Sequence, residues 1–421
     1  MLRVWTDSRS AGLLDRHGRR GTAFSYQEGT PAPFAVSITM PPRNASWNSD
    51  AGLHPIFQMN VPEGEMRDRL KRMFAKAAGT FDDLDLLGIV GRSQIGRLRY
   101  TAPDANLNED VPFQSIDEIL KARRGGELVE YLLERFAQNS GISGVQPKVM
   151  IRAEDSPHDP KPFIRGATHI VKFWTSEYPE LAANEHFCLM AAERAGLEVA
   201  RNDLSEDGAA LVVQRFDRKT DGTYRGFEDF CVLNGLGTDK KYLGGYETRL
   251  FKTIATFFAP QSPIERKVAL GAAFRLFVLN CIVGNGDAHL KNFAVTYDDA
   301  VSPLRFAPAY DVVTTRAYLP KDSMALTLNG STNWPNRKAI QLLGQARCEM
   351  DPAEVRETIE QVASSVADTR AAVRDYFRDR SAHPEVGKSM LSTWEQGLRE
   401  FASQVESLAF ESDEAVVGPR P

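Results

Sequence analysis

Residues 284–292 read Gly284-Asn-Gly-Asp-Ala-His-Leu-Lys-Asn292, and a second aspartate ends the later stretch Ala307-Pro-Ala-Tyr-Asp311. Together, Asp287, Asn292 and Asp311 supply the groups that phosphoryl transfer from a nucleotide needs. One carboxylate can orient and deprotonate an attacking hydroxyl, while an amide and a second carboxylate can hold a divalent metal on the phosphates. The apolar run over residues 274–284 predicts a buried helix that ends in a glycine-rich loop.

An aspartate followed five residues later by an asparagine is the spacing of a protein-kinase catalytic loop (D-x-x-x-x-N). The same spacing arises by chance, because Asp and Asn that follow glycines often form turns by bonding to their own backbone. The kinase interpretation of Asp287 and Asn292 therefore depends on finding the rest of a nucleotide site in the right order along the chain.

A glycine-containing loop, Gly141-Ile-Ser-Gly-Val-Gln-Pro-Lys148, lies between a helical stretch that ends near Gln138 and the strand-like residues 149–152. Its small residues would let backbone amides approach a polyphosphate, and Lys148 would add a point charge. The loop lacks the terminal Gly-Lys-Ser/Thr of a Walker A motif. An ordinary glycine turn in a hairpin is the alternative.

Three further segments follow in the order of a kinase fold. Residues 167–173 form a β-prone run that contains Lys172, which is costly to bury unless it meets an anion. Residues 184–195 show helical spacing, and Glu185 either pairs with Lys172, as in protein kinases, or lies exposed in the first turn. Residues 210–217 predict a buried strand that leads into a hinge at Gln214, Arg215 and Phe216.

With these motifs the chain resembles the HipA-type serine/threonine kinases, the toxins of bacterial type II toxin–antitoxin systems. The resemblance covers nearly the whole length. It rests on Ser143-Gly-Val-Gln-Pro-Lys148, His169-Ile-Val-Lys172, Asn184-Glu185, Gln214-Arg-Phe-Asp-Arg218, Glu228-Asp-Phe-Cys231, residues 284–293, Pro308-Ala-Tyr-Asp311, and Phe57-Gln-Met-Asn-Val-Pro-Glu-Gly64 followed by Arg67.

The resemblance implies ATP and Mg²⁺ as cofactors, Asp287 as the catalytic base, and Asn292 and Asp311 as the magnesium ligands. Lys172 would hold the α- and β-phosphates. The other residues expected in the ATP site are Ser143, Gly144, Val145, Gln146, Pro147 and Lys148 over the phosphates, Gln214, Arg215 and Phe216 at the adenine, and His289, Lys291 and Tyr310 beside the nucleotide.

The resemblance also implies partners. The expected substrate is a serine or threonine on a translation component, of the aminoacyl-tRNA synthetase type. The expected antitoxin is a HipB-like helix-turn-helix protein that brings the kinase to operator DNA. The basic stretches 16–20 and 92–99 are candidates for DNA contact, with solvated surface as the alternative.

Two departures from the family pattern concern regulation and the metal motif. Some members carry an autophosphorylated serine at the position of Gly141, so self-inactivation here would act through Ser143 or Ser140, or be absent. Tyr310-Asp311-Val stands in place of the Asp-Phe-Gly of eukaryotic kinases, as it does in this family. Two alternative functions stay open: a catalytically silent corepressor that binds antitoxin, and a small-molecule kinase.

Composition bounds the class of protein. The chain has 421 residues, a formal charge of −5 and four widely spaced cysteines, which argues against a nucleic-acid binder acting alone and against a zinc or disulfide framework. No apolar run approaches the roughly 18 residues of a membrane span, and the N-terminus is not a signal peptide, so a cytoplasmic protein is expected.

The predicted fold is α+β and two-lobed, like a protein kinase, with a mixed α/β N-terminal part and a mostly helical C-terminal lobe. The expected units are residues 1–104, a nucleotide-binding lobe over 105–218, a helical lobe over 219–410, and a polar tail over 411–421. Strands are predicted at 2–6, 22–26 and 34–40, and one helix at 65–77. Further helices are predicted at 120–137, 246–258, 264–281, 352–365 and 366–409, the last with a break at His383-Pro384.

Overall fold

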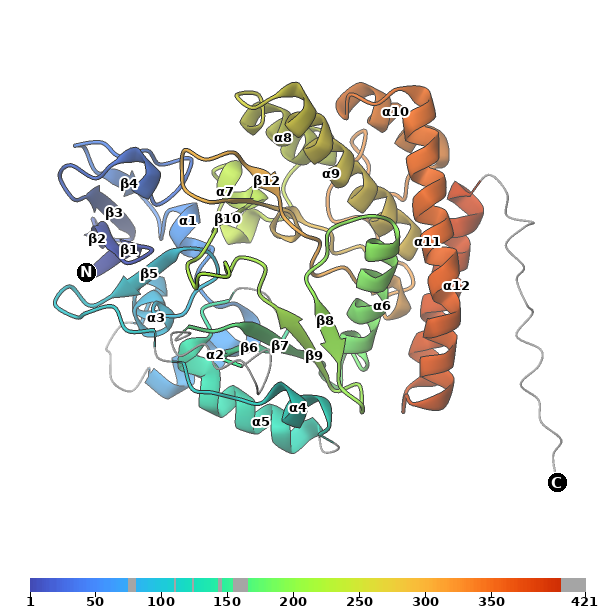
Figure 1. Cartoon of the computed structure of the whole chain (residues 1–421), viewed down its shortest axis with the longest axis horizontal. Helices are drawn as coiled ribbons and strands as arrows, with labels where there is room; N and C mark the ends of the chain where they lie inside the picture. Colours follow the sequence, from blue (N-terminus) through green and yellow to red (C-terminus); the bar gives the residue numbers. More distant parts are fainter. Residues whose placement is uncertain (75–80, 110, 123–124, 143–145, 154–165, 403–421) are drawn as a thin grey trace.

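The computed structural model describes residues 1–74, 81–109, 111–122, 125–142, 146–153 and 166–402. These residues form three antiparallel sheets and a set of helices that gathers in the C-terminal half (Figure 1). The predicted α+β architecture, with a mixed N-terminal part and a largely helical C-terminal part, is confirmed. The unit boundaries at 104, 218 and 410 stay a prediction.

The N-terminal part is built on a five-stranded sheet with the strand order β4-β3-β2-β1-β5. Alternating side chains of β1 and β3 pack Val4 and Phe24 against Phe57 and Tyr100 in one apolar core. The elements are β1 (Leu2–Thr6), β2 (Arg9–His17), β3 (Gly21–Tyr26), β4 (Trp47–Ser49), β5 (Leu98–Thr101), α1 (Pro55–Gln58), α2 (Gly64–Phe74) and α3 (Asp83–Val90).

Two predictions in this part are wrong. Residues 34–40 are not a strand. The 3₁₀ turn η1 (Ala32–Phe34) ends at Phe34, the Met40 N–H donates to the Ser37 carbonyl at 3.1 Å in a tight turn, and Ile38 donates its N–H to the Glu228 carboxylate instead of to a strand. The basic stretch 92–99 is not a surface patch. Arg97 and Arg99 are only 2% and 1% exposed, and Arg99 forms an ion pair with Glu109.

A four-stranded sheet with the order β6-β7-β9-β8 forms the middle of the chain. The antiparallel register of β6 and β7 places Lys148 directly opposite Lys172, so both lysines project from the same face. The elements are β6 (Lys148–Ile151), β7 (His169–Phe173), β8 (Asn202–Leu204), β9 (Ala210–Gln214), α4 (Ile116–Leu120), α5 (Gly125–Phe136) and α6 (Leu181–Arg194).

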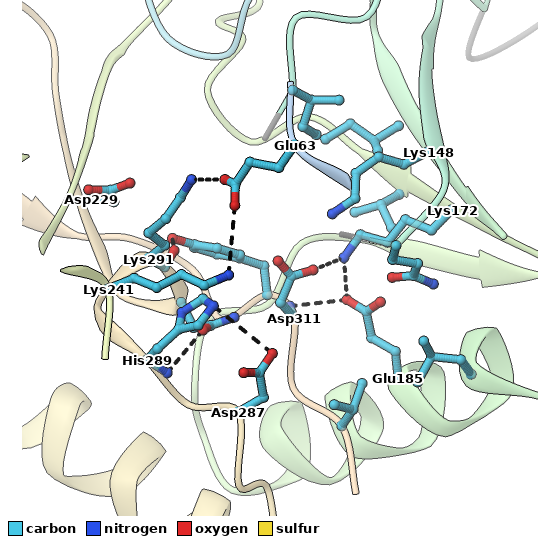
Figure 2. A pocket seen from close by; sticks show the side chains of 18 of the residues that line it. Glu63, Lys148, Lys172, Glu185, Asp229, Lys241, Asp287, His289, Lys291 and Asp311 are labelled. Atoms are coloured by element: carbon cyan, nitrogen blue, oxygen red, sulfur yellow. Dashed lines mark hydrogen bonds and ion pairs between the residues drawn. The ribbon is translucent and has the colours of Figure 1, made fainter. Parts of the chain in front are cut away.

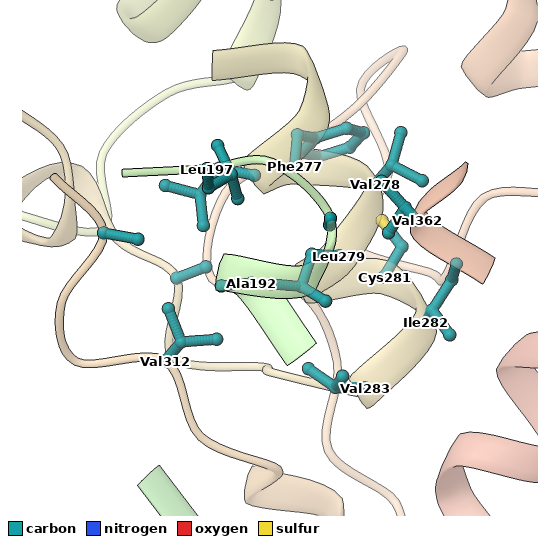
Figure 3. Packing of buried hydrophobic residues seen from close by; sticks show 14 of the residues in the cluster. Ala192, Leu197, Phe277, Val278, Leu279, Cys281, Ile282, Val283, Val312 and Val362 are labelled. Carbon is teal, nitrogen blue, oxygen red and sulfur yellow. The ribbon is translucent and has the colours of Figure 1, made fainter. Parts of the chain in front are cut away.

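The C-terminal part packs helices around α9 (Pro263–Val283), which starts at a Ser262/Glu265 capping box and ends at Gly284 in the left-handed conformation. Its buried face, with Phe277, Leu279 and Ile282, contacts α6 and α11 (Figure 3). The other elements are β10 (Gly226–Asp229), β11 (Ala294–Tyr297), β12 (Arg305–Phe306), α7 (Phe230–Leu233), α8 (Lys252–Phe257), α10 (Arg337–Arg347), α11 (Pro352–Asp379) and α12 (Pro384–Phe401).

The helix predictions here hold with changed bounds. The predicted helix 264–281 is α9, and the break at His383-Pro384 separates α11 from α12. The predicted division at 365 is wrong, since α11 runs without interruption from Pro352 to Asp379. Among the described residues, none of the helices is both long and apolar enough to span a bilayer.

Candidate active site

A cavity of about 800 Å³ lies where the three parts of the chain meet. The four-stranded sheet lines one side with Lys148 and Lys172, and the loop after α9 lines the other with Asp287 and Asn292. The N-terminal part contributes Glu63 (Figure 2). The cavity therefore collects charged side chains from segments that are more than two hundred residues apart in the sequence.

Lys172 lines this cavity and joins two carboxylates there. Its Nζ lies 2.6 Å from Glu185 Oε1 on α6 and also pairs with the Asp311 carboxylate. The Asp311 N–H donates to Glu185 Oε1 at 3.0 Å, so Glu185 orients both partners. The predicted pairing of Lys172 with Glu185 is confirmed, and the alternative of an exposed Glu185 is wrong, because that residue is 1% exposed.

Burial and charge act together on this group. Burial alone would raise the pKa of Asp311, but the nearby Lys148 and Lys172 outweigh it and hold that pKa well below its usual range. Burial lowers the pKa of Lys148, which forms no ion pair within the described part of the chain. A buried ammonium without a direct carboxylate partner fits an anionic ligand.

The loop that carries Asp287 is fixed by its own polar residues. The Asn285 amide donates to Asn280 Oδ1 at 2.9 Å, and Asn285 Oδ1 accepts the Asp287 N–H at 3.1 Å. The Thr315 hydroxyl accepts the Gly286 N–H at 2.7 Å. The Asp287 side chain is 52% exposed and faces the cavity. This loop holds one carboxylate open to a ligand while its backbone stays bonded.

The electrostatics around Asp287 favour a basic carboxylate. Partial burial, with Asp311 and Asp322 nearby, raises its pKa, although the Tyr242 hydroxyl, at 2.7 Å from Oδ1, and Lys241 act in the opposite direction. His289 lies 4.0 Å from Asp287 Oδ2 through Nε2. Burial and the charges of Lys241 and Lys291 lower the pKa of His289 to about 3, so its imidazole is neutral at pH 7.

Asn292 and Lys291 lie at the end of the same loop. Asn292 Oδ1 accepts the His289 N–H at 3.1 Å, and its side chain is buried beside the cavity. Lys291 pairs with Glu63 from the N-terminal part, and the Lys291 carbonyl accepts the Tyr310 hydroxyl at 2.7 Å. Glu63 also lies 3.7 Å from Lys241 (Figure 2).

The predicted hinge follows β9. The Arg215 guanidinium is engaged by protein groups and does not serve as an adenine contact. It pairs with Asp217 at 2.6 Å and donates to the Gln94 carbonyl at 2.7 Å. Phe216 and Tyr310 have ring centroids 6.0 Å apart, and both line the cavity. Among the described residues the Phe216 N–H has no hydrogen-bond acceptor, so it is available to a ligand.

The sequence itself matches two family models. The model of the HipA-like C-terminal domain matches residues 140–370, and that of the HipA N-terminal domain matches residues 2–101. The chain belongs to the HipA family.

Named relatives agree with this membership. A Sinorhizobium fredii protein named "Putative kinase Y4mE" is 30% identical over 339 residues, which cover 76% of this chain and 78% of that protein. The serine/threonine-protein kinase toxin HipA of Shewanella oneidensis is 29% identical over 198 residues, 42% of this chain and 43% of the toxin.

The fold of this HipA-family chain resembles that of HipA in the Shewanella oneidensis complex of HipA, HipB and operator DNA. The TM-score is 0.68 at 18% identity, with 97% of this chain and 99% of that chain covered.

Of the two expected autophosphorylation sites of this HipA-family chain, the structure describes Ser140 but not Ser143. Ser143, Gly144 and Val145 lie outside the described residues. Ser140 is fully buried, and its hydroxyl donates to the Phe136 carbonyl at 2.7 Å and accepts the Met150 N–H at 2.8 Å. Phosphorylation of Ser140 stays a prediction that requires this segment to leave the arrangement seen here.

Gly141 packs too closely for the serine that some family members carry there. A Cβ at this position would lie 2.1 Å from the Gln94 amide and 2.5 Å from the Ser93 carbonyl. The Gly141 N–H donates to that same carbonyl at 3.0 Å. In this chain the start of the glycine-containing loop is therefore docked on residues 93–94, with no room for a side chain at Gly141.

Sequence reasoning missed three side chains of the HipA-family site. Glu63, Lys241 and Tyr242 line the cavity. The side chains of Glu63 and Tyr242 contact the loop of residues 284–292, which Lys241 contacts through its carbonyl. The Phe57–Gly64 motif signalled only the segment that carries Glu63. Nothing in the residues around Tyr242 indicates that its hydroxyl reaches Asp287, because the two are 45 positions apart.

Proposed function

We propose that this chain is an ATP-dependent serine/threonine protein kinase and the toxin of a type II toxin–antitoxin pair. The observation that carries the proposal is the Lys172–Glu185–Asp311 group at one side of a cavity whose other side presents Asp287 and Asn292. A lysine held by a helix glutamate and an aspartate, with a second aspartate and an asparagine across the cleft, is the set that positions a nucleotide for phosphoryl transfer.

The chemistry assigned to these residues is in-line transfer of the γ-phosphoryl group to a protein hydroxyl. Asp287 accepts the proton of the acceptor hydroxyl as its oxygen bonds to phosphorus and the bond to the departing ADP oxygen breaks. Lys172 and Lys148 hold the phosphates from the sheet side. Phe216 and Tyr310 offer an apolar contact for the adenine, and the Phe216 N–H offers it a donor.

A divalent cation fits the oxygen donors of this site. Asp311 offers a carboxylate and Asn292 an amide oxygen, which suit Mg²⁺, and the phosphates and water would complete its shell. Among the described residues no three His, Cys, Asp or Glu side chains cluster as a self-contained metal site, which is consistent with a metal that arrives with its nucleotide. The bound metal would neutralise charge on the phosphates.

Incubation of the purified protein with Mg-ATP and a dephosphorylated casein tests the proposal, with mass spectrometry of both proteins. Wild type is expected to add phosphate to serine or threonine. Asp287→Asn is expected to abolish the transfer with ATP binding nearly intact, and Asp311→Asn to weaken magnesium-dependent ATP binding itself. Asp368→Asn, an exposed change on α11, is the control. Transfer at the wild-type rate by Asp287→Asn would show that another residue is the base.

The toxin role is proposed from the family and the named relatives. Growth arrest on expression, lost in Asp287→Asn and relieved by a co-expressed HipB-like helix-turn-helix protein, is the expected result. Phosphoproteomics of the arrested cells would identify the substrate, for which an aminoacyl-tRNA synthetase is the first candidate. Operator DNA would be bound through the antitoxin. Arrest that persists in Asp287→Asn would favour a silent binding partner, and phosphate on a metabolite would favour a small-molecule kinase.

A further inference from the structure

Tyr242 contacts the reactive carboxylate and has no assigned role. Its hydroxyl donates to Asp287 Oδ1 at 2.7 Å, and its ring meets the edge of the His289 imidazole with centroids 5.1 Å apart. The side chain is 50% exposed, so apolar burial alone does not hold it in place. The hydroxyl reaches the proposed base from outside the catalytic loop, so a role in the transfer reaction has to be considered.

The segment that carries Tyr242 is fastened to the catalytic loop on both sides of it. The Lys241 carbonyl accepts the Leu290 N–H at 3.1 Å, and the Tyr246 hydroxyl donates to the Ala288 carbonyl at 2.9 Å. A further contact ties the segment to the N-terminal part, where Gln58 Oε1 accepts the Thr238 N–H at 3.1 Å. Tyr242 therefore keeps a fixed place relative to Asp287.

The contact divides the two oxygens of the carboxylate. With Oδ1 engaged by Tyr242, Oδ2 is the oxygen left for an acceptor hydroxyl, and the Asp287 side chain is held in an orientation that faces the cavity. The charged and titratable groups that face Asp287 are His289, Lys241, Asp311, Asp322, Tyr178, Tyr246 and Tyr242 itself.

We propose that Tyr242 is a positioning residue of the transfer reaction: its hydroxyl holds Oδ1 of Asp287 so that Oδ2 faces the acceptor hydroxyl. This inference rests on the proposed function, in which Asp287 is the base. It assigns a task to a segment, residues 238–246, that borders the cavity and lies outside the catalytic loop.

Tyr242→Phe tests the hydroxyl while it keeps the ring beside His289. With Mg-ATP and dephosphorylated casein, kcat is expected to fall about tenfold, with KM for ATP within twofold of wild type. The Asp287 carboxylate loses its fixed orientation, while the contacts to ATP are unchanged. Since the hydrogen bond lowers the pKa of Asp287, its removal raises that pKa, and the acidic limb of the kcat profile moves to higher pH. Tyr131→Phe, which removes a half-exposed hydroxyl paired with Arg135 on α5, is the matched control.

Two outcomes would overturn the inference. An unchanged kcat with an unmoved pH limb would mean that the hydroxyl does not act on Asp287. A rise in kcat/KM for casein would mean that Tyr242 occupies the place of the acceptor and obstructs it.

A titration of ¹³C-labelled aspartate by NMR separates this inference from the proposed function. It follows the Asp287 carboxyl in wild type and Tyr242→Phe without any need for transfer. An Asp287 pKa that is equal in the two proteins would overturn the positioning contact, even in an active kinase. A wild-type chain that transfers no phosphate would instead overturn the proposed function, and the role of Tyr242 in transfer with it.

Discussion

At the scale of single residues, the buried Lys172 is the charge on which the site depends. Lys172→Met would leave Glu185 buried without its counter-ion, and removal of one partner of a buried pair costs about 3 kcal/mol of unfolding free energy. Urea unfolding measures this loss. Lys267→Met removes the same charge from an exposed pair with Glu354 on the surface, where little change is expected.

The double variant Lys172→Met/Glu185→Leu makes the argument sharper. If the loss in Lys172→Met comes from an uncompensated carboxylate, removal of that carboxylate should restore part of the stability. If the double variant loses as much stability as Lys172→Met and Glu185→Leu lose together, the cause is lost packing and not the unpaired carboxylate. Either result is independent of catalysis.

Glu228 is the second residue whose charge is expected to matter for stability. It is fully buried between the N-terminal part and β11, where its carboxylate accepts from Ser37, Ile38 and Tyr297. Burial raises its pKa to about 7 from the ordinary 4.5. A raised carboxyl pKa favours the folded protein while the group is protonated, so this contribution is lost as the pH rises from about 4.5 through 7.

Glu228→Gln should remove that pH dependence. Between pH 5 and 8.5 wild type should lose stability relative to Glu228→Gln by up to about 3 kcal/mol, since one pKa unit corresponds to about 1.4 kcal/mol. Thermal unfolding across this range gives the difference. Glu193→Gln, an exposed change on α6, controls for the loss of one negative charge. Parallel pH profiles of wild type and Glu228→Gln would contradict the assignment.

The residue-scale predictions from sequence succeeded where the local pattern carries the chemistry. Lys172 and Glu185 pair as expected because each sits in a recognisable strand or helix. Glu63 and Tyr242 could not be found, since their positions beside Lys291 and Asp287 arise only when distant segments pack. Arg97 and Arg99 were mistaken for surface charges because burial of an arginine depends on a partner elsewhere in the chain.

At the scale of elements, the end of α9 places the loop that carries Asp287. Gly284 has φ of +68°, which favours glycine, and a Cβ there would lie 2.5 Å from the Thr393 methyl on α12. Gly284→Ala is expected to cost about 1–2 kcal/mol and to lower phosphoryl transfer, because the loop to Asp287 must shift. Thermal unfolding and the casein assay measure the two effects.

A second glycine in α9 is the matched control. Gly271 lies in the helix interior, and a Cβ added there would meet no atom within 4 Å. Gly271→Ala should therefore stabilise the protein by about 0.5–1 kcal/mol and leave transfer unchanged. A loss of stability in Gly284→Ala and a gain in Gly271→Ala would separate the effect of helix propensity from that of the backbone geometry at the end of α9. A stable and fully active Gly284→Ala would refute the role of this cap.

The elements with a strong period were predicted well, and the irregular ones were not. The helix α9 and the break before α12 follow from apolar spacing and from Pro384. The strand predicted over 34–40 failed because the partner of its backbone is a carboxylate of the C-terminal part, which no local pattern reveals. Helix α3 was missed although Asp82 and Asp85 form its capping box.

At the scale of the whole molecule, the N-terminal part is joined to the rest by buried polar contacts. Asp217 pairs with Arg215 at 2.6 Å and accepts the Gly96 N–H at 2.7 Å, while Arg215 donates to the Gln94 carbonyl. Glu228 adds a second buried junction with Ser37 and Ile38. Contacts of this kind make the two parts dependent on each other, because separation would leave buried charges without partners.

We therefore expect residues 2–101 and the remainder to unfold together, and Asp217→Asn to uncouple them. The substitution leaves the fully buried Arg215 without its carboxylate, at a cost of about 3 kcal/mol or more.

Hydrogen exchange of peptides from each part in rising urea would give one common unfolding free energy in wild type and two in Asp217→Asn, with the N-terminal part opening first. Asp221→Asn, in the exposed turn that follows, should leave a single transition. Because Glu63 reaches Lys291 from the N-terminal part, this uncoupling should also lower phosphoryl transfer, in addition to any effect of Asp217 and Arg215 at the edge of the cavity. Two transitions already in wild type would mean that the junction is too weak to link the parts, and the effect of Glu63 on the site would then be local.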